Sequence, residues 1–269
     1  MTSQRDRALR DTLRDACLSG ARAGAEYILS RENDLEKIDW KEKSRADFVS
    51  EVDVGAEGRI ADALLAAVPD AAIMGEELTP AVSLGSGVTF IVDPLDGTTN
   101  FLHRYPWYAV SVAATRDEQV LAGVVLDVTR NIAYWATLGG GAFRSDGVPL
   151  RVSVITEPSR ALIGTGFPFK DPAGIAPYLP QLERITGQVA GVRRAGSAAL
   201  DLADVALGRF EAFWELMLAP WDMAAGILLV REAGGRITDL AGRDIGPSHS
   251  GVVASNGHLH EWMLAQLRS

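Results

Sequence analysis

The sequence has few of the side chains that carry thiol or imidazole chemistry. Cys17 is the only cysteine among 269 residues, which excludes a disulfide framework and a thiolate zinc site. It falls on the apolar side of a helical pattern, where we expect a small buried hydrophobe. The four histidines lack ligand spacing, and we expect His258 and His260 on a solvated helix face. No Ser-His-Asp or Cys-His arrangement is therefore predicted.

Long apolar runs and an excess of positive charge are missing as well. The N-terminal stretch MTSQRDRALRD has no signal-peptide core, and no apolar run is long enough to cross a bilayer. We therefore expect a cytoplasmic protein with no membrane partner. The formal net charge is −9, so direct nucleic-acid binding is not expected. A small anionic substrate would need a local positive field.

The overall composition, 47% hydrophobic and 23% charged residues, is typical of a globular protein. In the first half, helical spacing predicts helices over 6–29 and 53–68. The second of these is expected to point Val54, Ile60, Leu64 and Leu65 inward. Strands are predicted at 72–74 and 90–92, followed by an antiparallel meander across 108–138.

The second half mixes strands and helices in a different rhythm. Strands are predicted near 161–164, 210–216 and 251–255, and helices near 176–186, 197–206, 221–234 and 258–267. There is no strict βαβ alternation and no GxGxxG, which disfavours a Rossmann domain. The prediction is an α/β (α+β) fold in a single domain over 1–269, with approximate halves 1–150 and 151–269.

Four acidic residues stand at breaks between predicted elements. Glu76 follows one strand, Asp93 and Asp96 bracket a turn after the next, and Asp222 opens an apolar helix. Each alone could be a helix cap or a solvated charge. A buried cluster of carboxylates, however, requires protons or cations, and oxygen ligands suit hard cations such as Mg²⁺. Together the four residues indicate a metal site.

The motif DPLDGTT supplies a geometry for such a site. Pro94 fixes φ, so both aspartates and the Leu95 carbonyl can turn toward one point. Gly97 permits close backbone approach, and the Gly97 and Thr98 amides can meet an anion. Two cations beside exposed amides predict a phosphate-ester site, with the cations supplying the missing positive field.

Three stretches, taken in order, resemble the signature motifs of the inositol monophosphatase family: Gly75–Glu76–Glu77, Asp93–Phe101 and Trp221–Gly226. The stretches GTGFPF and RRAGSAALDLADVALGRFEAFWE are similar to its bacterial inositol-1-monophosphatase branch. The resemblance runs from Lys43 through Gly235. It implies a layered αβαβα sandwich of the inositol monophosphatase / fructose-1,6-bisphosphatase type, and a homodimer.

The resemblance also implies the metal ligands. Glu76, Asp93 and the Leu95 carbonyl would hold a first Mg²⁺. Asp93, Asp96 and Asp222 would hold a second, and Glu76 would touch a third through water. The approximate halves would differ in role, with 1–150 binding metal and 151–269 completing the substrate site, although Asp222 of the second half would join the metal ligands. Inhibition by Li⁺ is expected too.

Roles for the other residues follow from the same resemblance. Thr98, positioned with Asp53, would act with Glu76 in catalysis by orienting and helping to deprotonate the attacking water. The Gly97 and Thr98 amides would bind phosphate. Glu215 and the segment Gly196–Ser197–Ala198 would recognise the substrate hydroxyls, and Asp96 would also contact the substrate. Lys43 matches a family lysine near the metal loop.

The implied activity is Mg²⁺-dependent hydrolysis of inositol monophosphate or a similar small polyol or sugar phosphate. Alternatives within the superfamily are histidinol phosphate, fructose 1,6-bisphosphate and a 3′-phosphonucleotide. Thr99–Asn100–Phe101 and Glu215 favour the inositol type over the nucleotide type. Leu78 and Phe90 depart from the family pattern, which leaves the ligands intact but bears on substrate access.

A function of another class stays open. Some bacterial relatives associate with the transcription machinery, so the chain could be a regulatory partner in which catalysis is incidental. The intact set of carboxylates argues against a lost activity.

Overall fold

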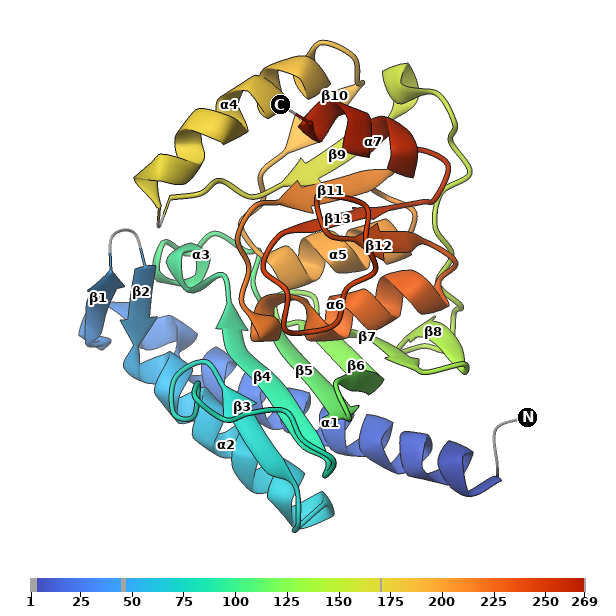
Figure 1. Ribbon diagram of the computed structural model, residues 1–269. Helices are drawn as coiled ribbons and strands as arrows, with labels where there is room; N and C mark the ends of the chain where they lie inside the picture. The colour runs from blue at the N-terminus through green and yellow to red at the C-terminus, as the bar shows by residue number, and fades with distance from the viewer. Residues whose placement is uncertain (1–3, 45–46, 170, 269) are drawn as a thin grey trace.

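The first layer consists of two long helices. The computed structural model describes residues 4–44, 47–169 and 171–268. Helices α1 (Gln4–Arg31) and α2 (Glu51–Ala67) pack against each other beneath a six-stranded sheet (Figure 1). A Cβ at Gly24 of α1 would lie 2.7 Å from Ile60 Cδ1 of α2, so this close approach requires glycine.

The buried face of α2 is not quite the predicted one. Ile60 and Leu64 are fully buried as expected, but Val54 and Leu65 are exposed, so that part of the prediction is wrong. The reason is that Asp53 and Glu57 occupy the inward stripe of the helix. A pattern based on hydrophobicity assigns such polar positions to the outside.

The second layer is the six-stranded sheet, in the order β3-β4-β5-β6-β7-β8. β3 and β4 are parallel, and every later pair is antiparallel, so the predicted meander is confirmed. The strands are β3 (Ala72–Gly75), β4 (Thr89–Asp96), β5 (Ala109–Arg116), β6 (Gln119–Asp127), β7 (Ile132–Thr137) and β8 (Gly141–Arg144).

Strand β4 continues through the DPLD motif. The sequence predicts a strand that ends at Val92 and a turn after it, but the strand runs to Asp96. Between Asp93 and Asp96 the register with β5 shifts, so Pro94 and Leu95 stand opposite the single residue Val110. Proline, which has no N–H to donate, is tolerated at such an irregularity. The motif is therefore a bulge inside a strand rather than a turn beyond it.

Three further layers complete the fold. Helices α5 (Ala198–Ala206) and α6 (Pro220–Glu232) lie between the first sheet and a five-stranded sheet ordered β10-β9-β11-β13-β12. Helices α4 (Pro172–Thr186) and α7 (His260–Leu267) cover its outer face. The strands are β9 (Leu162–Thr165), β10 (Gly191–Arg193), β11 (Ala212–Glu215), β12 (Arg236–Thr238) and β13 (Val252–Ser255).

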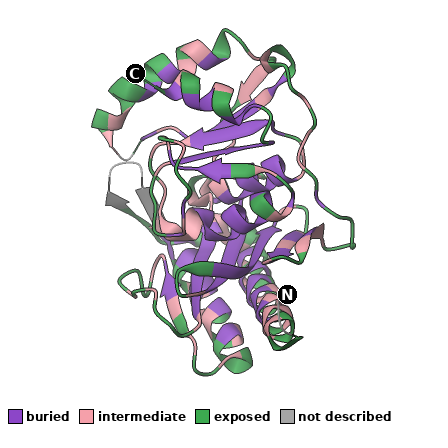
Figure 2. Cartoon of the chain, turned by 45° about the vertical axis from the view of Figure 1, so that its right-hand side comes forward, coloured by how far each residue is buried: buried purple, intermediate pink, exposed green. Residues whose placement is uncertain are grey.

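The predicted αβαβα sandwich is thus confirmed. Three apolar clusters fill the interfaces: one lies between α1, α2 and the first sheet, one surrounds α5 and α6 and reaches both sheets, and one lies between the second sheet and the outer helices. The central strands of both sheets are largely buried (Figure 2). The remaining elements are short: two 3₁₀ turns (Glu32–Lys37 and Pro158–Arg160), β1 (Trp40–Ser44), β2 (Asp47–Ser50) and α3 (Thr98–Leu102). Among the described residues, no helix combines the length and apolar character needed to span a bilayer.

The two C-terminal histidines have different environments. His258 is exposed as predicted, but His260 is fully buried, so its prediction is wrong. Its Nε2 lies 2.9 Å from Thr238 Oγ1 and its Nδ1 lies 2.9 Å from Ser255 Oγ. Two hydroxyl partners allow the neutral ring to be buried without an unmet hydrogen bond. Burial, together with the nearby Arg236 charge, lowers the pKa of His260 to about 4.

This environment predicts a loss of stability on acidification. An unfolded chain protonates His260 below its ordinary pKa of 6.5, whereas the folded chain resists protonation until about pH 4. The contribution of His260 is therefore complete above pH 6.5 and falls between pH 6.5 and 4, by about 3 kcal/mol at most. Between pH 7 and pH 5, the free energy of unfolding measured with urea should fall less in His260→Gln than in wild type. His258→Gln should behave as wild type, and an equal loss in all three proteins would contradict the assignment.

Candidate active site

The predicted site residues come together around one cavity of about 770 Å³. It lies where the ends of β3 and β4 meet the starts of α3, α5 and α6 (Figure 1). Its lining includes Glu76, Asp93, Leu95, Asp96, Gly97, Thr98, Gly196, Ser197, Ala198, Glu215 and Asp222. A smaller cavity of about 280 Å³ lies beside Arg231, and none of the predicted residues lines it.

Asp93 is the most buried carboxylate of the site. It is 1% exposed on strand β4, and its Oδ1 accepts a hydrogen bond of 3.0 Å from the Leu95 amide. Burial raises the pKa of Asp93 well above its usual value, and the charges of Glu76, Asp96 and Asp222 raise it further. Four carboxyl groups therefore lie close together here, and a bound cation would stabilise their ionised forms.

The donor set suits a hard metal ion, although it is not drawn together as a closed cage. Within the described residues, no three carboxylate, imidazole or thiolate groups already surround one point. Every candidate ligand atom is an oxygen, which is the chemistry that Mg²⁺ and similar cations require. The residues present therefore fit such a metal.

Asp96 is held by the first turn of α5. Its Oδ2 accepts hydrogen bonds of 2.7 Å from Ser197 Oγ and 2.7 Å from the Ala199 amide. Burial raises the pKa of Asp96, and these two donors oppose that rise. The Ser197 hydroxyl thus donates to Asp96, and its predicted contact with substrate stays a prediction.

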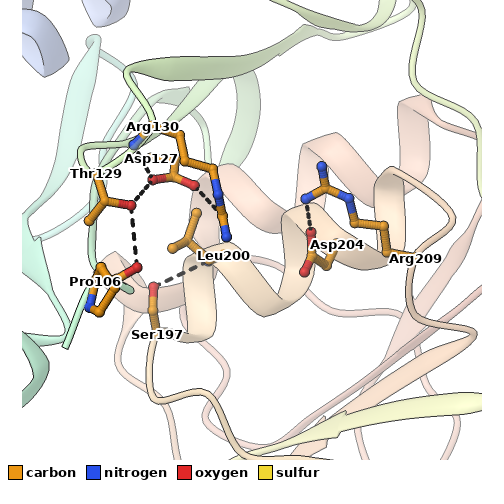
Figure 3. A network of polar contacts seen from close by, with 8 residues as sticks. All are labelled: Pro106, Asp127, Thr129, Arg130, Ser197, Leu200, Asp204 and Arg209. Atoms are coloured by element: carbon orange, nitrogen blue, oxygen red, sulfur yellow. Dashed lines mark hydrogen bonds and ion pairs between the residues drawn. The ribbon is translucent and has the colours of Figure 1, made fainter.

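The same serine starts the helix. Ser197 Oγ accepts from the Leu200 amide at 3.4 Å, which is the N-cap predicted from the sequence (Figure 3). Farther along α5, Asp204 pairs with Arg209 at 2.7 Å, and nearby Asp127 pairs with Arg130 at 2.7 Å (Figure 3). Both carboxylates are largely buried, so each needs its cation. These pairs stabilise the frame that presents Ser197.

The half-buried Thr98 and the buried Asp53 form a pair at the edge of the cavity. Thr98 Oγ1 lies 2.7 Å from Asp53 Oδ1 and 3.1 Å from the Leu95 carbonyl oxygen, so its single proton has two acceptors. Asp53 Oδ2 accepts from the Ser50 amide at 2.8 Å and from Ser50 Oγ at 2.5 Å. Burial raises the pKa of Asp53, while the Ser50 and Thr98 hydrogen bonds lower it. Asp53 does not line the cavity and reaches it through Thr98.

Two more carboxylates are set by backbone contacts. Asp222 lies in the first turn of α6, where its Oδ2 accepts from the Ala219 amide at 2.7 Å. Glu76 directly follows β3, and its amide donates to the Val92 carbonyl of β4 at 3.2 Å, beside Asp93. The side chain of Lys43, the remaining predicted residue, lies outside the described part of the structure.

Glu215 ends β11 and lies against the Gly166 backbone. A Cβ on Gly166 would come within 2.0 Å of the Glu215 carboxylate, so only glycine leaves room for it. This explains the second glycine of the GTGFPF stretch, one of the stretches on which the family resemblance rests. Glu215 thereby lies on the wall of the cavity, at the end of β11.

Two charged residues of the cavity wall, Asp201 and Arg194, were not among the predicted site residues. Asp201 is 2% exposed, and its Oδ1 has no hydrogen-bond partner among the described residues. Burial raises its pKa well above the usual value, and Glu215 raises it further. The Arg194 guanidinium lies 4.9 Å from the Phe169 ring centre. The available signal for Asp201 was an acid inside the apolar run AALDLADVALG; nothing in the pattern marked Arg194.

Comparison with known proteins decides the family. The model of the inositol monophosphatase family matches residues 10–269. The chain belongs to the inositol monophosphatase family. The resemblance read from the three motifs is thereby confirmed.

Relatives in the family carry two kinds of name. Inositol-1-monophosphatase of Caulobacter vibrioides is 39% identical over 94% of this chain and 99% of that protein. The Nus factor SuhB of Pseudomonas aeruginosa is 43% identical over 93% of this chain and 94% of its own. Among solved structures, the extragenic suppressor protein suhB from Bartonella henselae matches with a TM-score of 0.87 and 36% identity, covering 95% of this chain and 98% of that one.

Membership of the inositol monophosphatase family establishes the reaction class. Family membership supports phosphatase activity for this chain, and members of the family generally depend on metal ions. The layered fold of the solved relatives agrees with the five layers described above.

Proposed function

We propose that the chain is a Mg²⁺-dependent phosphatase that hydrolyses inositol monophosphate or a similar small polyol phosphate. The observation that carries this proposal is the burial of Asp93 on a cavity that Glu76, Asp96 and Asp222 also line. Four carboxylates gathered in a protein of net charge −9 are understandable if they hold cations.

In this proposal Glu76, Asp93 and the Leu95 carbonyl hold one Mg²⁺, and Asp93, Asp96 and Asp222 hold another. Bound there, the ions would lower the pKa of a water molecule and neutralise charge on the phosphate and the leaving oxygen. Thr98 orients that water, because its hydroxyl proton is taken by Asp53 or the Leu95 carbonyl oxygen and its oxygen is left as an acceptor on the cavity wall. Asp53 fixes the direction of the hydroxyl and stabilises a proton that reaches it.

The substrate side of the proposal rests on the rest of the cavity wall. The Gly97 and Thr98 amides would bind phosphate, since Gly97 (φ 103°) turns the backbone at the start of α3. The hydroxyls of the polyol would meet Asp96, Glu215 and the segment Gly196–Ser197–Ala198. We further propose one domain over 1–269, in which 1–150 binds metal and 151–269 completes the substrate site, and a cytoplasmic homodimer inhibited by Li⁺.

A substrate panel tests the choice of substrate. With Mg²⁺ present, we expect kcat/KM for inositol 1-phosphate to exceed by at least about tenfold the values for histidinol phosphate, fructose 1,6-bisphosphate and a 3′-phosphonucleotide. One or two extra hydrogen bonds to substrate hydroxyls are worth a difference of this size. Phosphate release is the measurement. A clear preference for one of the other three substrates would assign the chain to that activity instead.

A second candidate function is contact with the transcription machinery. The observation that favours it is the name of the Pseudomonas aeruginosa relative, a Nus factor. Cells carrying Asp93→Asn in place of the native chain distinguish the two roles. If such cells grow as wild type while deletion cells do not, the regulatory role is the essential one. The deletion phenotype in Asp93→Asn cells would make catalysis essential.

A further inference from the structure

Glu57 is a buried carboxylate for which the catalytic assignment gives no role. It lies in the middle of α2 and is 1% exposed. Its Oε2 accepts from the Glu77 amide at 2.7 Å, and its Oε1 accepts from the Leu78 amide at 3.0 Å. A charge buried to this degree is stable only when its oxygens are met by strong donors.

Both amides belong to the two residues that directly follow Glu76. On the other side, Gly75 directly precedes Glu76, and a Cβ there would lie 2.0 Å from Glu57 Oε1. Glycine at 75 therefore leaves the space that the carboxylate fills. The Glu57 carboxylate thus contacts the chain immediately before and immediately after Glu76, and it does so from a rigid helix.

Glu57 stands one helical turn after Asp53 on the same buried face of α2. Asp53 holds the Thr98 hydroxyl, and Glu57 holds the loop that carries Glu76. One helix therefore fixes two distant parts of the site, one after β3 and one after β4. A displacement of α2 would move both together.

We infer that Glu57 is a positioning residue for the metal ligand Glu76: it holds the 77–78 amides so that the Glu76 carboxylate faces the cavity. This inference rests on the proposed function, because it takes Glu76 to be a ligand. Groups that orient metal ligands in this way typically change metal affinity or activity by 10–100-fold when they are replaced.

Glu57→Gln is the sharpest substitution. Glutamine keeps the shape and one acceptor oxygen, but its NH₂ group would face one of the two backbone N–H donors. We expect the Mg²⁺ dissociation constant, measured by isothermal titration calorimetry without substrate, to rise at least about tenfold. Glu57→Asp keeps the charge but is one methylene shorter, so its Mg²⁺ dissociation constant should rise less than that of Glu57→Gln. The aspartate variant is the one to measure if the glutamine variant does not fold.

Ile60→Val is the matched control. Ile60 is fully buried one turn farther along α2 and does not line the cavity, so its substitution lowers stability without touching the loop. Its Mg²⁺ dissociation constant should stay within twofold of wild type. A folded Glu57 variant that also stays within twofold overturns the inference, while the wild-type titration still supports the metal site. A wild type that shows no saturable Mg²⁺ binding overturns the proposed function and, with it, this inference.

Discussion

Asp93→Asn is expected to lower kcat/KM for phosphate release by about 10³-fold or more, which corresponds to about 4 kcal/mol of transition-state stabilisation. Asp93 is the one carboxylate proposed to touch both Mg²⁺ ions, and it is the most buried of the four. An asparagine keeps one oxygen but loses the charge that balances the cations. Steady-state phosphate release at saturating Mg²⁺ measures the effect.

Thermal unfolding distinguishes a loss of metal binding in Asp93→Asn from a folding defect. Without Mg²⁺, Asp93→Asn should unfold at the same temperature as wild type or higher, because one of several repelling charges is gone. Added Mg²⁺ should raise the unfolding temperature of wild type much more than that of the variant, since only a ligand bound to the folded state stabilises it. Full activity in a folded Asp93→Asn variant would show that the metal assignment is wrong.

Thr98→Val is expected to lower kcat by about 10²- to 10³-fold, the range for loss of a group that handles a proton in the transition state. Valine has nearly the same shape but cannot donate to Asp53, which lies 2.7 Å from the threonine hydroxyl. It also leaves the buried Asp53 carboxylate with one donor fewer, so some stability should be lost. The kcat at saturating substrate and Mg²⁺ is the measurement.

Thr98→Ser is the matched variant for this prediction. Serine retains the hydroxyl, so its kcat should stay within about tenfold of wild type. Mg²⁺ affinity should change little in either variant, because the threonine side chain is not proposed as a metal ligand. An equal loss of kcat in the serine and valine variants would show that the hydroxyl is not the group responsible, because serine keeps it and valine does not.

The elements of this fold were largely predictable because their patterns are local. The meander across 108–138 has short polar turns between apolar strands, and the register confirms it. The end of β4 was not predictable, because a bulge at Pro94 and Leu95 depends on pairing with β5. Likewise, the burial of His260 depends on hydroxyls 5 and 22 residues away in the chain.

For the site, the sequence predicts the candidate metal ligands but not the residues that support them. Glu76, Asp93, Asp96 and Asp222 were identified by type, position and family motif, and all four line the cavity. Glu57 was not, since a glutamate in an amphipathic helix normally faces water, and only the tertiary structure places it against the 77–78 amides. Supporting contacts of this kind join elements that are far apart in sequence, so local sequence patterns do not predict them.

The central claim is that the carboxylates around Asp93 hold the metal ions used in hydrolysis. Anomalous diffraction from a crystal soaked with Mn²⁺, as an electron-rich substitute for Mg²⁺, tests it most directly. We predict anomalous peaks within about 2.0–2.4 Å of oxygens of Asp93 and of at least one of Glu76, Asp96 and Asp222. Peaks only at other places on the molecule, with none beside Asp93, would contradict the account.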